Sequence, residues 1–248
     1  MSHEYTDSNS RTTYDRFLEF ERLMKVYPGT MVRLHNATPI GFCAFSLTLF
    51  VYAMYMAGAT VPISTSPAIA MGLALFYGGL IELLAGLYEL RLGNNFYALA
   101  FCSYAGFWFG LGSLYVSGSF NFSANITDAT ALNNAMGVFF LAWTIFTLAM
   151  LISSVRTNIV SVVFFFFLLL TYVLLTASYF LNGHLDLRRA AGAIGIFTAV
   201  VGWYKAFASL LRKGDNAYFN LPLFDISKIR NRCSCPSIGS PPCVEVTI

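Results

Sequence analysis

Apolar runs about as long as a bilayer is thick recur along most of this chain, and they constrain its fold more than any other feature. The hydrocarbon core of a bilayer is about 30 Å across, so a helix needs roughly 20 apolar residues to cross it. A single segment can pair all its backbone polar groups in that core only as a helix. Only 11% of the residues are charged, against about 25% in soluble domains. We therefore expect an all-α integral membrane protein with six transmembrane helices.

Helix-breaking residues mark the ends of the six expected spans. Pro39 and Pro67 each precede or open an apolar run, and the first turn of a helix tolerates proline because its N–H groups have no partner inside the helix. The longest connection, residues 117–134, is rich in Ser, Asn and Thr. The expected spans are 40–57, 67–90, 96–115, 135–152, 159–181 and 190–211.

The two ends of the chain are polar, and we expect both outside the bilayer. In the N-terminal region, 1–35, the segment 15–27 alternates aromatic and charged residues at helical spacing, which predicts an amphipathic helix on the membrane surface. Residues 36–212 form the expected transmembrane domain, and residues 213–248 form a basic, cysteine-bearing tail. No cleavable apolar segment precedes the first span, so that span is expected to insert as a signal anchor.

Lys and Arg predict the orientation, because short cytosolic loops retain positive charge. With the N-terminus inside, twelve of the 15 Lys and Arg residues fall in cytosolic segments, and only Arg188 and Arg189 fall outside. Both termini are therefore predicted in the cytosol. The outside loop then carries two triplets that match the glycosylation pattern, at Asn121 and Asn125, although such triplets often arise by chance.

Three ionisable residues fall inside the expected spans. Glu82 is the most informative, because a carboxyl roughly 13 Å from Arg91 is costly in a membrane unless it faces a cavity or a partner. Glu89 shares its face but lies next to Arg91, where we expect a solvated ion pair. Lys205, near the end of the last span, is expected to extend its ammonium to the interface. For Glu89 and Lys205 a structural role is thus favoured over a functional one.

Small residues at helical spacing predict close helix packing and leave room for at most a narrow path. They recur in the second, third and sixth expected spans, and the first span carries an aromatic face with hydroxyls. The small residues are Gly79, Gly86, Ser103, Gly106, Gly110, Ser113, Gly192, Gly195, Ala199 and Gly202, and the aromatic face holds Gly41, Phe45, Thr48, Tyr52 and Tyr55.

Several other kinds of chemistry lack their sequence patterns. The three histidines do not pair with Cys, Asp or Glu at metal-ligand spacing, so no metal site is expected. No glycine loop for phosphate and no nucleophile arrangement occurs, so we expect neither an enzyme nor a cofactor. The basic residues are not clustered on a face, and no nucleic acid partner is expected.

Residues 36–42, followed by Phe45, resemble the Asn-Pro-Ala-Pro-Leu-Gly-Leu signature of the acetate uptake transporters. That family includes fungal acetate and ammonia-export-linked proteins and bacterial succinate/acetate permeases. The resemblance covers about residues 33–225, because further runs combine glycine, polar and aromatic positions in the family's order. Those runs are 76–79, 85–86 with Glu89, 93–94, 103–104, 107–108, 143–147 and 157–158.

The resemblance implies six-helix protomers assembled as hexamers, with one path through each protomer. On that path, Asn36 is the expected substrate or gate contact, Pro39 and Gly41 shape the mouth, and Phe45 narrows the path together with apolar residues of the fifth span. Glu89, Trp108 and Trp143 are secondary candidates, since they fall in the runs that resemble the family.

This sequence also departs from the family pattern. Ala37, Thr38 and Phe42 replace Pro, Ala and Leu of the signature, which bears on substrate preference. Glu82 stands where bacterial relatives often carry Gln, and it is our candidate proton site.

The resulting hypothesis is a plasma-membrane transporter of acetate and related short monocarboxylates, working as a proton symporter or passing the protonated acid. N–H groups at the helix start after Asn36 suit a carboxylate. Two alternatives stay open: export of ammonia or ammonium, and a non-transporting acetate sensor or membrane scaffold. The expected partners are a small carboxylate, protons, the lipid bilayer and further copies of the chain.

The orientation can be tested with epitope tags. Because the charge asymmetry places residues 117–134 outside, a tag inserted between Asn121 and Thr130 should bind antibody on intact cells. Tags at either terminus should bind only after permeabilisation. Labelling of a terminal tag on intact cells would contradict both the orientation and the assignment of the loops.

Overall fold

The computed structural model describes residues 15–16, 36–115, 125–211, 219 and 221–224 of the chain. The chain divides into two units, Met1–Asn36 and Ala37–Ile248. In the first unit Asp15 and Arg16 are helical and exposed. The remainder of the amphipathic helix predicted at 15–27 lies outside the described residues, as does most of the tail.

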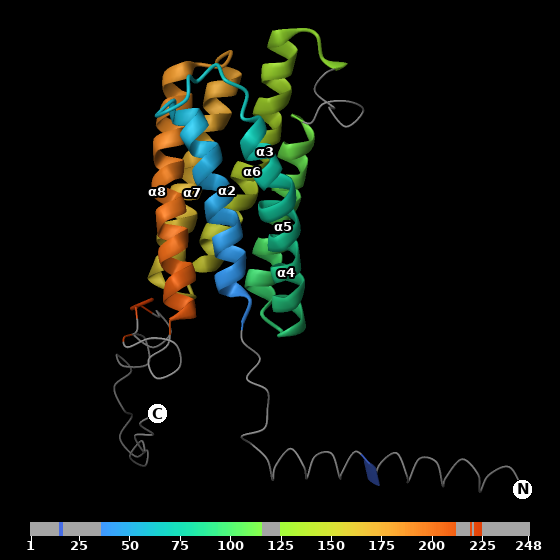
Figure 1. The fold of residues 1–248 in the computed structure, drawn as a ribbon, viewed down its shortest axis with the longest axis vertical. Helices are drawn as coiled ribbons and strands as arrows, with labels where there is room; N and C mark the ends of the chain where they lie inside the picture. The colour runs from blue at the N-terminus through green and yellow to red at the C-terminus, as the bar shows by residue number, and fades with distance from the viewer. Residues whose placement is uncertain (1–14, 17–35, 116–124, 212–218, 220, 225–248) are drawn as a thin grey trace, which may run out of the picture. The chain divides into compact units, whose positions relative to one another are not determined.

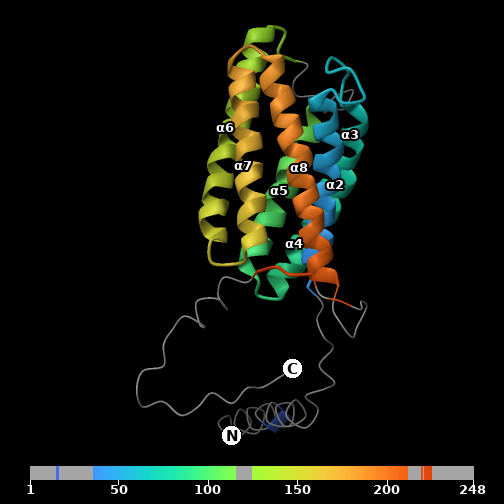
Figure 2. The same cartoon turned by 90° about the vertical axis from the view of Figure 1, so that its left-hand side faces the viewer.

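In the described part of the second unit, every regular element is a helix (Figures 1 and 2). Five helical segments are long and apolar enough to cross a membrane, with α3, η1 and α4 counted as one continuous segment. α5 lies in the same bundle, but its Asn, Ser, Tyr and Gly residues make it less apolar than these five. The elements are α2 (Thr38–Ala57), α3 (Ala68–Leu73), the π-helix η1 (Ala74–Ile81), α4 (Glu82–Arg91), α5 (Asn95–Ser113), α6 (Ala129–Ser154), α7 (Ile159–Phe180) and α8 (Leu185–Leu210).

The helices run alternately up and down the bundle, and α2 packs against several of them. α2 packs against α8 on one side and against η1 and α4 on the other. α7 lies between α6 and α8, and α5 packs against η1 and α4 (Figures 1 and 2). We name the two ends of the bundle after the ends of α2: the Thr38 end, where α4 finishes, and the Ala57 end, where α3 begins.

Two helices begin earlier than the sequence pattern predicts. α6 starts at Ala129, because the side chain of Asp128 accepts hydrogen bonds from the N–H groups of Thr130 and Ala131 and so caps the helix. α8 starts at Leu185. Arg188 and Arg189 are therefore helical residues, and the prediction that placed them in a loop before the span was wrong.

Small residues of the second and sixth predicted spans pack as predicted, and Gly106 of the third does not. A Cβ atom on Gly192 would overlap the backbone of Ala53 and Ala57 in α2, and one on Gly202 would overlap Ser46. Gly106 in α5 is exposed, and a Cβ atom there would meet nothing within 4 Å. The prediction of close packing within the protomer was therefore wrong for Gly106, because α5 faces away from the other helices at that position.

The π-helix η1 interrupts the second span just before Glu82, and nothing in the hydrophobic pattern predicts it. Its glycines allow close contact with α5, since a Cβ on Gly78 would lie 2.8 Å from Trp108 and one on Gly79 would lie 2.7 Å from Phe109. π-helical turns add residues to a helix and occur often at functional sites. Here the turn changes the rotation of everything that follows it, including the direction of Glu82.

The contact of α8 with α2 can be tested by one substitution at two glycines. Gly192→Ala should lower the free energy of unfolding by about 1–3 kcal/mol, because the added methyl group meets α2 backbone that cannot move aside. Gly72→Ala in α3 should raise it by up to about 1 kcal/mol, since that glycine is exposed with no neighbour within 4 Å. Thermal denaturation of the purified variants in detergent measures both. Equal stability of the two variants would contradict the close contact.

Candidate functional site

Aromatic side chains from four helices fill the interior of the bundle. Between ring centroids, Phe45 of α2 lies 5.2 Å from Tyr104 of α5 and 5.6 Å from Phe164 of α7. We call these three rings the aromatic constriction. Trp108 is fully buried and packs against Phe45 at 5.7 Å. The structure therefore brings Phe45 against the fifth predicted span, while its role in narrowing a path stays a prediction.

Glu82 faces a small cavity beside the aromatic constriction. Its side chain is fully buried, and neither carboxyl oxygen has a hydrogen-bond partner in the described part of the chain. A buried carboxyl group without a hydrogen-bond partner is costly, so packing alone gives Glu82 no compensation at this depth. The cavity measures about 10 Å³, close to what one water molecule needs. It is lined by Phe42, Phe45, Glu82, Ala100, Phe101, Tyr104, Phe164 and Phe165.

Glu89 is also fully buried, so the expected solvated ion pair with Arg91 was wrong. The hydroxyl of Thr38 donates to its Oε1 at 2.8 Å, and the Nδ2 of Asn94 donates to its Oε2 at 2.8 Å. These bonds join the start of α2, the end of α4 and the residue before α5. Counting along one helix cannot reveal them, because both donors come from other segments. Thr38, which departs from the family signature, supplies one of the donors.

Lys205 does not extend to the interface, contrary to the sequence prediction. Its side chain is 1% exposed, and its ammonium donates hydrogen bonds to the hydroxyls of Tyr97 and Ser161 and, at 3.3 Å, to Asn158. It also lies 4.8 Å from the centre of the Phe42 ring. The close packing of α8 on α2 turns Lys205 inward. A cation is thus held inside the Thr38 end of the bundle.

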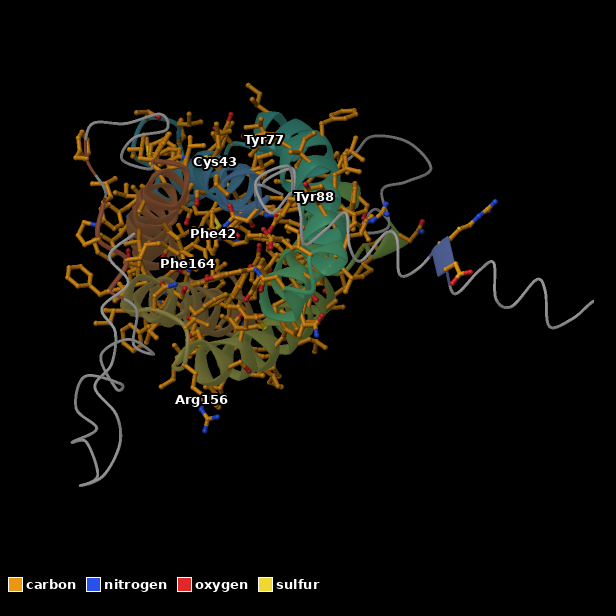
Figure 3. The ribbon with its side chains drawn as sticks, turned by 90° about the horizontal axis from the view of Figure 1, so that it is seen from below. Phe42, Cys43, Tyr77, Tyr88, Arg156 and Phe164 are labelled. Carbon is orange, nitrogen blue, oxygen red and sulfur yellow. The ribbon has the colours of Figure 1, made fainter. Side chains whose placement is uncertain are left out.

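Figure 3 looks along the bundle from that end. Phe42 and Phe164 lie inside the ring of helices, whereas Arg156 projects outside it. Phe42 and Phe164 touch edge to face at 5.2 Å between ring centroids. The rings therefore continue from Lys205 to the constriction without a wide opening between them.

The other sequence candidates fall at several places. Pro39 and Gly41 are buried at the start of α2, where Gly41 lies against the ring of Phe101. Asn36 is the last residue of the first unit, and its contact with substrate stays a prediction. Trp143 is half-buried and packs edge to face on Phe107 at 5.2 Å.

For glycosylation, Asn125 is exposed, and Asn121 lies outside the described residues. Tyr104 and Phe164 cannot be identified as site residues from periodicity. Phe164 is one of four consecutive phenylalanines, of which only the fold shows which face inward. The described residues hold no group of three or more His, Cys, Asp or Glu side chains arranged to bind a metal.

Comparisons with known proteins identify the family of this chain. The sequence profile of the GPR1/FUN34/yaaH family matches residues 23–228. The chain is 34% identical to acetate permease A of Emericella nidulans, over 76% of this chain and 65% of that protein. It is 34% identical to ammonia transport outward protein 2 of Saccharomyces cerevisiae, over 77% of this chain and 66% of that protein. The matched part is thus slightly less than two thirds of each relative.

Among solved structures, the chain is similar to that of the bacterial acetate channel SatP. The TM-score is 0.64 at 27% sequence identity, and the match covers 76% of this chain and 98% of the bacterial one. The helical bundle therefore matches nearly the whole of that bacterial chain.

The Glu89 contacts can be tested by a double-mutant cycle. Thr38→Val keeps the side-chain shape but removes the donor to Glu89, and we expect it to lower the free energy of unfolding by about 1 kcal/mol, within the range for buried membrane hydrogen bonds. In a Glu89→Gln background the same change should cost less. The readout is denaturant unfolding in mixed micelles. The control is Thr198→Val, whose hydroxyl bonds only a carbonyl of its own helix. Additive effects of the two changes would contradict the predicted coupling.

Proposed function

The chain belongs to the GPR1/FUN34/yaaH family, and on that premise we propose that it transports acetate and related short carboxylates across a membrane. The observation that carries the proposal is the shared fold with a bacterial acetate channel, which extends over 98% of that channel. A relative named as an acetate permease supports the same substrate class. Transport also accounts for five apolar helices built around polar interior residues.

The proposed path runs along the bundle axis from the Ala57 end to the Thr38 end. The aromatic constriction of Phe45, Tyr104 and Phe164 is its narrowest part, since Phe45 touches the other two rings and all three line the small cavity. Such a gap favours a solute with a methyl group and a small polar end over larger or strongly hydrated ones. Pro39 and Gly41 shape the mouth at the Thr38 end. Asn36 is the proposed substrate contact.

Glu82 is the proposed proton site of a symport mechanism. Its carboxyl lies in the cavity at the constriction, where a passing carboxylate would come close to it. Two carboxylates in one apolar cavity repel each other, so passage of the anion favours a proton on Glu82 or on the substrate. Proton and substrate then pass the constriction together as a neutral pair.

The proposal includes the architecture in the membrane. α5, with 19 residues, is about 28 Å long and would serve as a sixth span. The outer surface of the bundle carries many exposed large apolar side chains, suited to lipid or to neighbouring copies of the chain. We place the protein in the plasma membrane as a hexamer with one path per protomer and both termini in the cytosol.

Export of ammonia or ammonium is a second candidate, favoured by the relative named for outward ammonia transport. The buried carboxyl of Glu82 is compatible with a cation as well as with a proton. An aromatic constriction also passes neutral ammonia. Competition experiments therefore have to include ammonium.

Uptake by the purified protein in liposomes tests the proposal. Radiolabelled acetate should enter protein-containing vesicles faster than empty ones, and unlabelled acetate should compete. Competition by lactate or succinate would define the carboxylate range. Ammonium movement without acetate movement would favour the second candidate, and movement of neither would leave a sensor or a scaffold.

Glu82→Gln tests the proton site. The change keeps the side-chain shape but removes titration, so the bundle should form and uptake should lose most of its dependence on external pH. The comparison belongs above about pH 6, where nearly all acetate is the anion. Glu89→Gln is the matched control, because that carboxyl is equally buried but held by Thr38 and Asn94. If Glu82→Gln keeps the wild-type pH profile at equal protein amount, Glu82 is structural.

A further inference from the structure

A second cavity lies at the Ala57 end of the bundle, on the far side of the aromatic constriction from Lys205. Its volume is about 50 Å³, room for about four water molecules at roughly 10–15 Å³ each. Its walls come from α2, from the connection that follows α2, from the residue two positions after α5, from α7 and from α8. Its lining includes one cation, Arg188, and five hydroxyl-bearing side chains: Tyr52, Tyr55, Thr65, Tyr115 and Tyr179.

Arg188 is the only cation that lines this cavity among the described residues. Its guanidinium carbon lies 5.1 Å from the centre of the Tyr179 ring. Its Nε is buried and has no hydrogen-bond partner in the described part of the chain. A buried N–H of a charged group that lacks an acceptor is costly, and an anion in the cavity would remove that cost.

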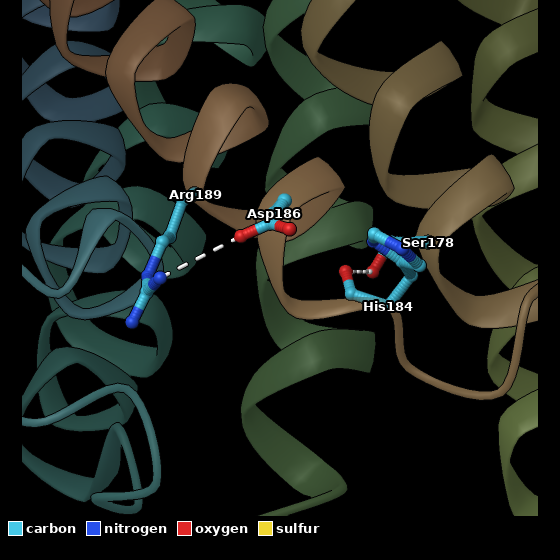
Figure 4. A network of polar contacts seen from close by, with 4 residues as sticks. All are labelled: Ser178, His184, Asp186 and Arg189. Atoms are coloured by element: carbon cyan, nitrogen blue, oxygen red, sulfur yellow. Dashed lines mark hydrogen bonds and ion pairs between the residues drawn. The ribbon is translucent and has the colours of Figure 1, made fainter.

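The neighbouring arginine behaves differently. Arg189 is exposed and pairs with Asp186 at 3.6 Å, one turn along the surface of α8 (Figure 4). Asp186 is therefore engaged by Arg189, and it does not line the cavity of Arg188. Two adjacent arginines thus have separate environments: Arg188 is partly buried and lines the cavity, whereas Arg189 is exposed on the surface of α8.

We propose that the cavity around Arg188 is a binding site for a small monocarboxylate anion. Guanidinium binds carboxylate through two parallel charge-assisted hydrogen bonds, and tyrosine hydroxyls can donate to the same group. The tyrosine rings accept a short apolar chain such as the methyl group of acetate. A volume of about four water molecules limits the ligand to a few non-hydrogen atoms.

The position of the cavity connects this site to the proposed transport path, and in this respect the inference rests on the proposed function. Tyr52 touches Trp108 at 6.2 Å between ring centroids, and Trp108 touches Phe45 of the constriction at 5.7 Å. Tyr179 stacks on Phe140 at 5.3 Å. The cavity thus adjoins the aromatic interior, and Trp108 links its Tyr52 to Phe45. An anion held by Arg188 would lie on the Ala57 side of the constriction.

Binding to the purified full-length protein in detergent tests the site without requiring transport. Saturation-transfer NMR with acetate as the probe gives the dissociation constant for wild type, Arg188→Gln and Arg189→Gln. Arg188→Gln should weaken acetate binding about tenfold, equivalent to about 1.4 kcal/mol. Arg189→Gln should leave it within about twofold, because its charge is exposed and already paired.

Acetamide, a neutral molecule of the same shape, separates anion recognition from loss of structure. Its binding should not change in Arg188→Gln, whereas a distorted cavity would weaken both ligands. Should Arg188→Gln fail to give monodisperse protein, Arg188→Lys takes its place. Lysine keeps the charge without the planar fork, and about threefold weaker acetate binding is expected.

Wild-type acetate affinity in the Arg188 variants, equal losses in the Arg188 and Arg189 variants, or no acetate binding by wild type would each overturn the site. Liposome uptake is scored separately. A protein that binds acetate through Arg188 but moves none keeps the site and loses the proposed function. A protein that moves acetate with affinity independent of Arg188 does the reverse.

Discussion

The close contact between α2 and α8 determines the rest of the interior. Gly192 and Gly202 bring the two helices together until an added methyl group would strike α2. That contact holds α2 between α8 and the η1–α4 segment, so its aromatic face meets α5 and α7. Phe45 consequently touches both Tyr104 and Phe164. The same contact turns Lys205 toward Phe42 and away from the interface.

Ionisable side chains mark three levels of the aromatic interior. Arg188 lies at the Ala57 end, Glu82 beside the constriction, and Lys205 at the Thr38 end. A cation near each end lowers the cost of bringing an anion out of water, while a carboxyl in the middle resists an unprotonated one. This order of charges is compatible with the proposed transport, in which a short carboxylate enters at the ends and passes the constriction together with a proton.

Some site residues can be identified from the sequence, and others only from the fold. Glu82 is recognisable from the sequence because a carboxyl deep in an apolar run is costly and seldom has a purely structural role. The structure shows that it lines a cavity. Glu89 and Lys205 were assigned to water because each lies near the end of its span. Their partners, Thr38 for one and Ser161 for the other, come from helices distant in sequence. Arg188 and Arg189 are identical neighbours in the chain, and only the rotation of α8 separates them.

The sequence by itself determined a helical membrane protein, most span boundaries to within a few residues, and the family, because hydrophobic length and glycine-aromatic spacing are local properties. The tertiary structure alone decided the π-helix before Glu82, the three rings of the constriction and the inward direction of Lys205 and Arg188. The physical reason is that a side chain's environment in a bundle depends on which helix packs against it. That choice is made by close contacts such as Gly192 on α2, between residues far apart in the chain.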